Sequence, residues 1–293
     1  MTPKFCEGLK SKMTAKQRMV RAQGGEAIPA LGLGTWKMGE RGNRKKDEIA
    51  ALRLGLDLGL GLIDTAELYG SGGAEQVVGE AIRGRRDEVY LVSKVLPNNA
   101  SRKGTIKAAE RSLKHLKCDH INLYLLYWLG SYPLEETFAA FERLVADGKI
   151  GRYGVSNFDI GEMAKAMAVP GGDAVCVNQV LYNPAQRSVE AELQGYCIER
   201  EIALMAYSPL DQGGILQDAV LEQIADRHGV TTATVAVAWT LRFTNIVSIP
   251  KATAPEHVRA CAAARDLELT DDDLAAVDRT FPPPQPGARL AIY

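Results

Sequence analysis

The chain alternates short apolar runs with longer segments of helical periodicity. Strands that alternate with helices pair in parallel through crossover connections, and eight such units predict a closed (β/α)8 TIM barrel. The runs are nearly continuous in apolar residues, as is typical of strands that are buried on both faces. The eight expected strands are Ala30–Gly34, Gly61–Asp64, Val89–Lys94, Ile121–Tyr127, Tyr153–Ser156, Ala174–Gln179, Ala203–Tyr207 and Ile246–Ile249.

Two of the intervening segments show the helical periodicity most clearly. Their apolar residues recur every three or four positions, which places them on one face of a helix, and we expect that face to be buried. These residues are Ile106, Ala109, Leu113 and Leu116 in one segment, and Leu134, Phe138, Phe141 and Val145 in the next.

A glycine pair precedes the first expected barrel strand. Gly24-Gly25 separates Arg18–Gln23 from Glu26–Leu31, and a two-residue glycine turn between short strands predicts a β-hairpin. We expect this hairpin to cap the amino-terminal mouth of the barrel. No linker divides the chain, so we expect one domain over residues 1–293, with residues 1–13 as a disordered leader. The doubly wound alternative lacks a Gly-x-Gly-x-x-Gly motif after a strand.

Composition narrows the function classes. The 293 residues carry a net charge of −1, so nothing favours a nucleic-acid partner. The five cysteines form no Cys-x-x-Cys pair, which indicates neither a disulfide framework nor a zinc site, and we expect no metal. No apolar segment is long enough to span a membrane and no signal peptide is evident, so we expect a cytoplasmic protein, monomeric or weakly homo-oligomeric, with a small-molecule partner.

Three side chains with acid–base chemistry lie at or just past strand ends. Asp64 ends the second expected barrel strand, Lys94 ends the third, and Tyr69 lies in the loop after Asp64. The carboxyl ends of barrel strands line the active site, so we expect these groups to meet. A free phenol has a pKa of about 10. We expect the Lys94 ammonium to lower the pKa of Tyr69 and Asp64 to keep Lys94 charged, so that Tyr69 can protonate a carbonyl oxygen.

Each of these residues taken alone has an ordinary structural explanation. Asp64 could cap a loop, Tyr69 could be a half-exposed aromatic residue and Lys94 a surface lysine. Their joint occurrence, as Asp-x-x-x-x-Tyr followed by a strand-end lysine, favours a site for proton transfer.

Several longer segments resemble the aldo-keto reductases, and the resemblance extends along nearly the whole chain. It implies a TIM-barrel enzyme that transfers hydride reversibly between a nicotinamide cofactor and an aldehyde or ketone, with Tyr69 as the general acid. The segments are Gly34-Thr35-Trp36, the run Gly-Lys-Ile-Gly-Arg-Tyr-Gly-Val-Ser-Asn-Phe at 148–158, Val-Asn-Gln at 177–179, Ala-Tyr-Ser-Pro-Leu at 206–210 and Ile-Pro-Lys-Ala-Thr-Ala-Pro-Glu at 249–256.

The resemblance also implies the cofactor contacts. Ser156, Asn157 and Gln179 correspond to side chains that hydrogen-bond the nicotinamide carboxamide. Tyr207 corresponds to a tyrosine that stacks on the nicotinamide ring, and a flat aromatic face suits a planar ring. Further contacts are implied for Gly34, Thr35, Trp36, Ser208, Leu210, Lys251, Thr253 and His257.

The segment around Lys251 resembles the part of the family that binds the adenosine phosphate. Lys251 precedes Thr253-x-x-Glu256, a capping-box pattern that predicts a helix start, and a helix start beside a lysine is an anion site. The family often has an arginine where this chain has His257, and Arg259 is close enough in sequence to be an alternative phosphate partner. NADP(H) is favoured over NAD(H).

One expected member of the site is different. The fourth strand carries Tyr127 where the family usually has a histidine, which orients the carbonyl by donating a hydrogen bond. A phenol also donates a hydrogen bond, but from a longer side chain. Displacing a reacting atom by about an ångström can cost on the order of 100-fold in rate. We therefore expect Tyr127 to occupy the position that orients the carbonyl, and we expect the reductase activity to be altered by it.

Apolar residues dominate the expected substrate side. Trp36, Tyr69 and Trp128 offer apolar walls, and residues 95–101 and 282–293 resemble the variable substrate loops of the family. This composition suits small aldehydes, ketoaldehydes or aromatic aldehydes.

Two other functions remain open on the sequence. The substitution at Tyr127 allows a cofactor-binding protein with little or no turnover. Lys94 allows a barrel lyase that forms a Schiff base, although Asp64 beside a charged lysine argues against it.

Overall fold

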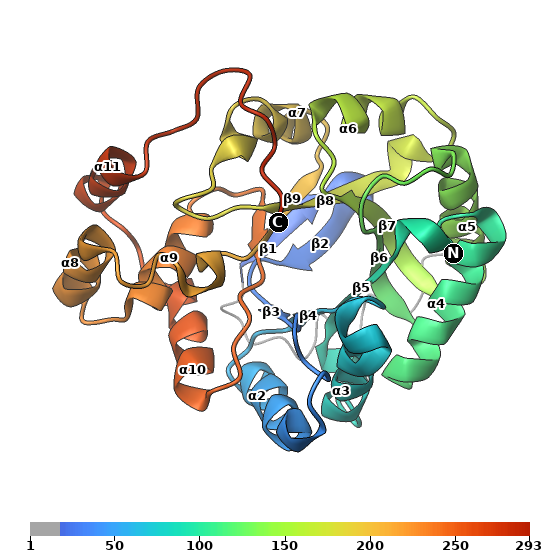
Figure 1. Cartoon of the computed structure of the whole chain (residues 1–293), viewed down its shortest axis with the longest axis horizontal. Coiled ribbons are helices and arrows are strands. Elements are labelled where there is room, and N and C mark those ends of the chain that lie inside the picture. The colour runs from blue at the N-terminus through green and yellow to red at the C-terminus, as the bar shows by residue number, and fades with distance from the viewer. Residues whose placement is uncertain (1–17) are drawn as a thin grey trace.

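The computed structural model describes residues 18–293 and contains a barrel of eight parallel strands. Each strand pairs with the next along the chain, and the first and last are joined by backbone bonds between Ser248 and residues Ala30 and Gly32, at 2.8 and 3.0 Å. This confirms the expected (β/α)8 barrel (Figure 1). The strands are β3 (Leu33–Gly34), β4 (Leu62–Asp64), β5 (Tyr90–Val95), β6 (Ile121–Leu126), β7 (Ile150–Ser156), β8 (Val175–Leu181), β9 (Ala203–Tyr207) and β10 (Ile246–Ser248).

Helices surround the strands and bury the outer surface of the barrel (Figure 1). They are α2 (Lys45–Asp57), α3 (Gly73–Ala81), α4 (Arg102–Leu116), α5 (Leu134–Ala146), α6 (Ile160–Met167), α7 (Leu193–Glu199), α8 (Ala219–His228), α9 (Thr232–Thr240), α10 (Pro255–Ala263) and α11 (Asp271–Thr280).

The amino-terminal hairpin is present, with shorter strands than the sequence suggested. Strand β1 (Met19–Ala22) pairs antiparallel with β2 (Glu26–Pro29). The turn has three residues, Gln23–Gly25, and its two glycines adopt positive φ angles of 70° and 76°, which other residues rarely adopt. The expected two-residue turn was therefore wrong.

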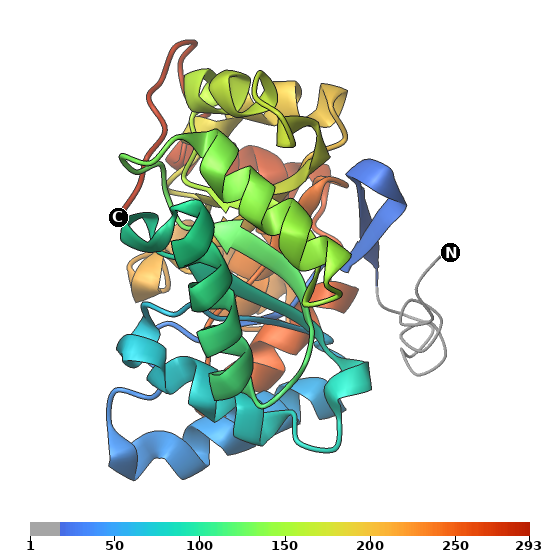
Figure 2. The same ribbon diagram turned by 90° about the vertical axis from the view of Figure 1, so that its right-hand side faces the viewer.

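The hairpin lies at the amino-terminal mouth of the barrel. The backbone nitrogen of Gln23 donates to the carbonyl of Glu201, just before β9, and Arg152 at the start of β7 donates to the carbonyl of Gly24. Figure 2 shows the hairpin on the side of the molecule opposite the carboxyl terminus. The carboxyl ends of the barrel strands are left to form the functional site.

The helical stripes are confirmed with one correction. The α4 stripe is buried except for Ile106, which is half-buried, and Phe138 and Phe141 of α5 are fully buried. Val145, however, is 39% exposed, and Leu144 is buried in its place. The buried face of α5 is centred closer to Leu144, so Val145 lies at its edge in the last helical turn.

Four further expectations concern absences and the start of the chain. Between residues 18 and 293 no helix is long and apolar enough to cross a membrane, and no group of side chains there could hold a metal ion. The cysteines of this part of the chain, Cys118, Cys176, Cys197 and Cys261, are free. The expected leader, residues 1–13, lies outside the described residues.

Candidate active site

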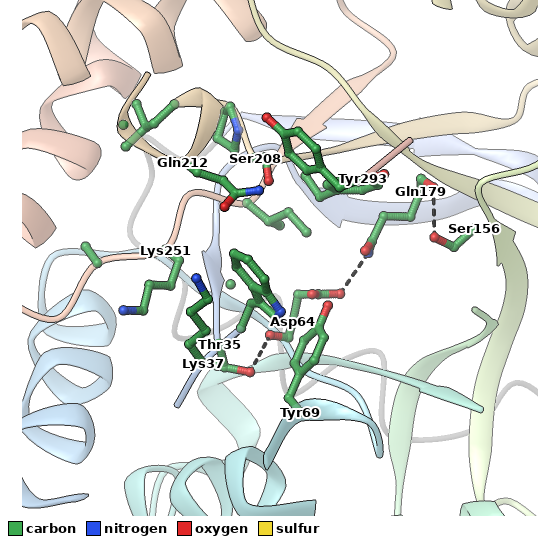
Figure 3. A pocket seen from close by; sticks show the side chains of 18 of the residues that line it. Thr35, Lys37, Asp64, Tyr69, Ser156, Gln179, Ser208, Gln212, Lys251 and Tyr293 are labelled. Atoms are coloured by element: carbon green, nitrogen blue, oxygen red, sulfur yellow. Dashed lines mark hydrogen bonds between the residues drawn. The ribbon is translucent and has the colours of Figure 1, made fainter. Parts of the chain in front are cut away.

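A cavity of about 830 Å³ opens at the carboxyl ends of the barrel strands (Figure 3). It brings together side chains from the carboxyl ends of the strands and from the loops that follow them, as expected for a barrel of this kind. The residues singled out from the sequence that line it are Gly34, Thr35, Trp36, Asp64, Tyr69, Tyr127, Trp128, Ser156, Asn157, Gln179, Tyr207, Ser208, Leu210, Lys251 and His257.

Lys94 lies outside the cavity lining and hydrogen-bonds groups at the bottom of the cavity. Its ammonium donates to Asp64 Oδ2 at 2.8 Å, to the Thr65 carbonyl at 2.8 Å and to the Tyr69 hydroxyl at 3.4 Å. Lys94 is completely buried and Asp64 is 2% exposed, so this ion pair is shielded from water. The structure therefore brings together the three groups that the sequence associated with proton transfer.

The buried position of Lys94 also bears on the lyase alternative. A Schiff-base lysine must present its nitrogen to a carbonyl carbon in the cavity. The Lys94 nitrogen does not line the cavity and already has three hydrogen-bond partners. The geometry argues against that chemistry.

Burial dominates the electrostatics of this cluster. It raises the pKa of Asp64 and lowers that of Lys94, and the attraction between the two charges opposes both shifts. It also raises the pKa of Tyr69 well above its usual value, and the negative charge of Asp64 and the phenol of Tyr127 add to that rise. The pKa of Tyr69 is therefore raised overall, opposite to the expected net lowering, because desolvation of the phenolate is the largest contribution. Tyr69 is thereby kept protonated at neutral pH.

Tyr127 lies directly against Tyr69. It follows β6, and its backbone nitrogen donates to the Val95 carbonyl at 3.0 Å. Its hydroxyl donates to the Tyr69 hydroxyl oxygen at 3.3 Å, and the two rings meet edge to face with centroids 6.1 Å apart. Burial raises the pKa of Tyr127 as well. Two phenol hydroxyls therefore reach one point of the cavity.

Polar side chains at the carboxyl ends of β7 and β8 form a wall of the cavity next to Asp64. Ser156 Oγ donates to the Gln179 carbonyl at 2.9 Å, and Gln179 Nε2 donates to Asp64 Oδ1 at 2.8 Å (Figure 3). Asn157 comes immediately after β7 with a φ of 61°, a left-handed conformation that asparagine tolerates better than most residues. This conformation turns its amide to the Tyr127 carbonyl at 3.2 Å.

Tyr207 is the last residue of β9 and contacts Asn157. Its hydroxyl donates to Asn157 Oδ1 at 2.9 Å, and burial raises its pKa to about 12. The carboxyl-terminal Tyr293 packs beside it, with ring centroids 6.4 Å apart, and bonds Asp211 through its hydroxyl. Tyr293 and Ile292 both line the cavity, and neither was identified individually from the sequence.

Two lysines lie at one end of the cavity (Figure 3). Lys37, Lys251 and His257 all line it, and Figure 3 shows Lys37 and Lys251 on the side away from Ser156 and Gln179. Partial burial lowers the pKa of Lys251, and the positive charges of Arg44 and Lys37 contribute to the shift, although two nearby glutamates oppose it. Lys37 was not identified from the sequence as a cavity residue, because no motif or hydrophobic periodicity marks the loop that contains it.

The helix after Lys251 begins later than expected. The N-cap of α10 is Ala254, without a side-chain cap, and Pro255 occupies the first helical turn. Proline is favoured at the first helical position and disfavours a helical residue before it, so the helix begins there and the expected Thr253 capping box was wrong. Thr253 and Arg259 do not line the cavity, and Arg259 is exposed.

Comparisons with known proteins agree with the barrel fold. The model of the Aldo/keto reductase family matches residues 30–281, so the chain belongs to this family. It is 46% identical over 275 residues to methylglyoxal reductase YeaE of Escherichia coli (strain K12), covering 92% of this chain and 97% of that protein. It is 34% identical to glyoxal reductase of Bacillus subtilis (strain 168), covering 90% of this chain and 93% of that protein.

Solved structures show the same architecture. The crystal structure of an aldo-keto reductase from Klebsiella pneumoniae in complex with NADPH superposes with a TM-score of 0.91 and 45% identity. The match covers 94% of this chain and 99% of that one.

Proposed function

We propose that this protein reduces small aldehydes and ketones with NADPH, and that it catalyses the reverse oxidation as well. The observation that carries the proposal is the buried Asp64–Lys94 pair, whose ammonium lies 3.4 Å from the Tyr69 hydroxyl at the bottom of an 830 Å³ cavity. Family membership and the methylglyoxal and glyoxal reductases among its relatives support it.

The cavity suits a dinucleotide with an extra phosphate. Bound NADPH would supply the hydride that is added to the carbonyl carbon. Tyr207 offers a flat face for the nicotinamide, and Ser156, Asn157 and Gln179 offer the donors and acceptors that a carboxamide requires. At the other end Lys251 and Lys37, with His257 in the first turn of α10, would hold the adenosine phosphate, because lysines beside a helix start form an anion site.

Tyr69 would donate the proton to the carbonyl oxygen. Its raised pKa ensures that the proton is present, and Lys94 at 3.4 Å stabilises the phenolate that forms when the proton leaves. Asp64 holds Lys94 in place and charged. Tyr127 would donate a second hydrogen bond to the same carbonyl oxygen, since its hydroxyl lies 3.3 Å from that of Tyr69.

The substrate side of the cavity favours small neutral carbonyl compounds. Trp36, Leu68 and Trp128 are apolar and each about 40% exposed around Tyr69. The cations that line the cavity belong to the end assigned to the phosphate. A substrate carboxylate would therefore lose its hydration without gaining a partner. We accordingly propose 2-oxoaldehydes such as methylglyoxal, rather than 2-oxo acids, as substrates.

A second candidate is a cofactor-binding protein with little turnover. Tyr127 favours it, because the Tyr127 hydroxyl bonds directly to that of Tyr69 and occupies space that a carbonyl oxygen needs. The two candidates share the cofactor site and differ in whether a carbonyl displaces this hydrogen bond.

Steady-state oxidation of NADPH tests the proposal and separates the two candidates. We expect methylglyoxal and a nitrobenzaldehyde to drive oxidation, pyruvate to be at least about 10-fold poorer, and NADH to be a weaker donor than NADPH. Tight NADPH binding without oxidation by any of these carbonyls would support the second candidate.

A further inference from the structure

We propose that Glu67 is a positioning residue that sets the distance between Tyr69 and Lys94, an inference that rests on the proposed function of this pair. Glu67 lies between Asp64 and Tyr69 in the loop after β4 and is only 8% exposed. No sequence motif pointed to it. Its side chain joins the loop that carries the proton donor to the segment that carries the ammonium.

The hydrogen bonds of Glu67 go to that segment and to the helix that follows it. Its Oε1 accepts from the backbone nitrogen of Leu96 at 2.7 Å and from Asn99 Nδ2 at 2.9 Å. Its Oε2 pairs with Arg111 of α4. Its backbone nitrogen donates to the carbonyl of Lys94 at 3.4 Å. Glu67 thus bonds the chain at Lys94 and again two residues beyond it.

These contacts bear directly on the catalytic distance. Tyr69 is two residues after Glu67, and Leu96 is two residues after Lys94. The bond between the Glu67 carboxylate and Leu96 therefore links the segment that carries Tyr69 to the segment that carries Lys94. The Lys94–Tyr69 distance of 3.4 Å is already near the upper limit of a hydrogen bond. A small movement of the Tyr69 loop away from β5 would therefore break this hydrogen bond.

The contacts of Glu67 with Leu96, Asn99 and Arg111 form a junction, and the charge of Glu67 makes this junction rigid. Its side chain is 5% exposed, whereas that of Arg111 is 46% exposed, so the carboxylate depends on all of its donors to compensate for lost hydration. Removing one partner leaves a buried charge that is under-bonded, and the loop must then move to reach water. Arg111 therefore contributes to the position of Glu67, because it pairs with the Glu67 carboxylate.

The junction also reaches the substrate wall. Pro97 follows Leu96 directly, and a Cβ placed on Gly130 would lie 2.6 Å from Pro97 Cβ. The loop that carries Trp128 therefore packs directly on the segment that Glu67 holds. Displacing this segment would move the proton donor, the ammonium and an apolar wall relative to one another.

Matched variants test this role. Glu67→Gln keeps the shape of the side chain but cannot pair with Arg111, and we expect kcat to fall by at least about 10-fold, because sub-ångström displacement of reacting groups is costly. The dissociation constant for NADPH should stay within about 2-fold, since Glu67 is not part of the cavity lining. Arg111→Met should reproduce the loss of kcat, and Arg111→Lys, which keeps the cation, should restore most of it.

The control is another buried carboxylate. Asp273 of α11 pairs with Arg227 and His228 of α8, away from the cavity, so Asp273→Asn should lower thermal stability while kcat is retained. An equal loss of kcat in Asp273→Asn would mean that general loosening explains the effect, and the proposal would be overturned. Wild-type kcat in both Glu67→Gln and Arg111→Met would overturn it too.

A readout without turnover separates this proposal from the proposed function. NMR of tyrosine labelled at Cζ reports the surroundings of the Tyr69 hydroxyl, with Tyr69→Phe used to assign the signal. We expect that signal to shift in Glu67→Gln and in Arg111→Met but not in Asp273→Asn. If none of the tested carbonyl compounds drives NADPH oxidation by the wild-type protein, the proposed function fails. The Tyr69 signal then still decides whether Glu67 positions the Tyr69 hydroxyl.

Discussion

The hydroxyl of Tyr127 lies 3.3 Å from that of Tyr69 and donates a hydrogen bond to it. This contact joins the proposed proton donor to the residue that differs from the usual histidine. A phenol has one proton to donate, so a carbonyl oxygen that enters the site must take over the hydrogen bond that Tyr69 receives from Tyr127 in the free protein. The contact therefore defines what substitutions at Tyr127 should do.

Substitution of Tyr127 should alter rate more than cofactor affinity. Tyr127→Phe removes the second donor, and a hydrogen bond to a developing charge is worth about 1.5–3 kcal/mol, so kcat should fall by about 10- to 100-fold. Tyr127→His supplies a shorter donor and should raise kcat above that of the protein as it stands. Steady-state kinetics with methylglyoxal measures both, and an unchanged kcat in Tyr127→Phe would contradict the assigned role.

The protonation of Tyr69 gives a pH prediction. Burial, Asp64 and Tyr127 raise its pKa, so the protonated form extends to higher pH than for a free tyrosine. The Cζ signal of Tyr69 should therefore stay unchanged from about pH 7 to 10, and free labelled tyrosine in the same buffer provides the comparison. Ionisation of Tyr69 below about pH 9 in the free protein would show that Lys94 outweighs burial.

Lys251 should determine the preference for NADPH. Lys251→Ala removes a cation from the cavity end assigned to the adenosine phosphate, so NADPH affinity should fall by about 10-fold while NADH affinity changes little. Arg259→Ala is the matched control, since this arginine is exposed and outside the cavity lining. Fluorescence titration with each nucleotide checks this, and an equal loss for NADPH and NADH would contradict it.

Asp273 should make stability depend on pH. It is desolvated, which raises its pKa, but bonds from Arg227, His228 and Thr270 outweigh this and leave the pKa well below the ordinary value. A depressed folded-state pKa stabilises the fold above the unfolded-state value of about 3.9, and this stabilisation is lost as the pH falls below that value. Asp273→Asn should lower the Tm at pH 7, and the difference from wild type should shrink as the pH falls below about 4. A constant difference would contradict the argument.

The sequence was sufficient to predict the barrel and the meeting of Asp64, Lys94 and Tyr69. Each strand is a short apolar run, and Asp64 and Lys94 come at strand ends, where the parallel barrel brings them together. Such features depend on local pattern and on the repeat of one supersecondary unit.

What the sequence could not give depends on contacts between distant segments. Glu67 and Arg111 are 44 positions apart, and Tyr293 reaches Asp211 across 82 positions. The direction of the Tyr69 pKa depends on how far burial excludes water, which the residue types alone do not determine. The start of α10 was misplaced because Pro255 has a stronger local effect than the Thr253 pattern.

Turnover by the wild-type protein and by Tyr69→Phe, with NADPH and methylglyoxal, tests the central claim most directly. The account predicts measurable NADPH oxidation by the wild-type protein, a loss of at least about 100-fold in kcat for Tyr69→Phe, and NADPH binding that stays within about 2-fold. Equal rates for the two proteins would show that Tyr69 is not the proton donor, and the proposed mechanism would be wrong.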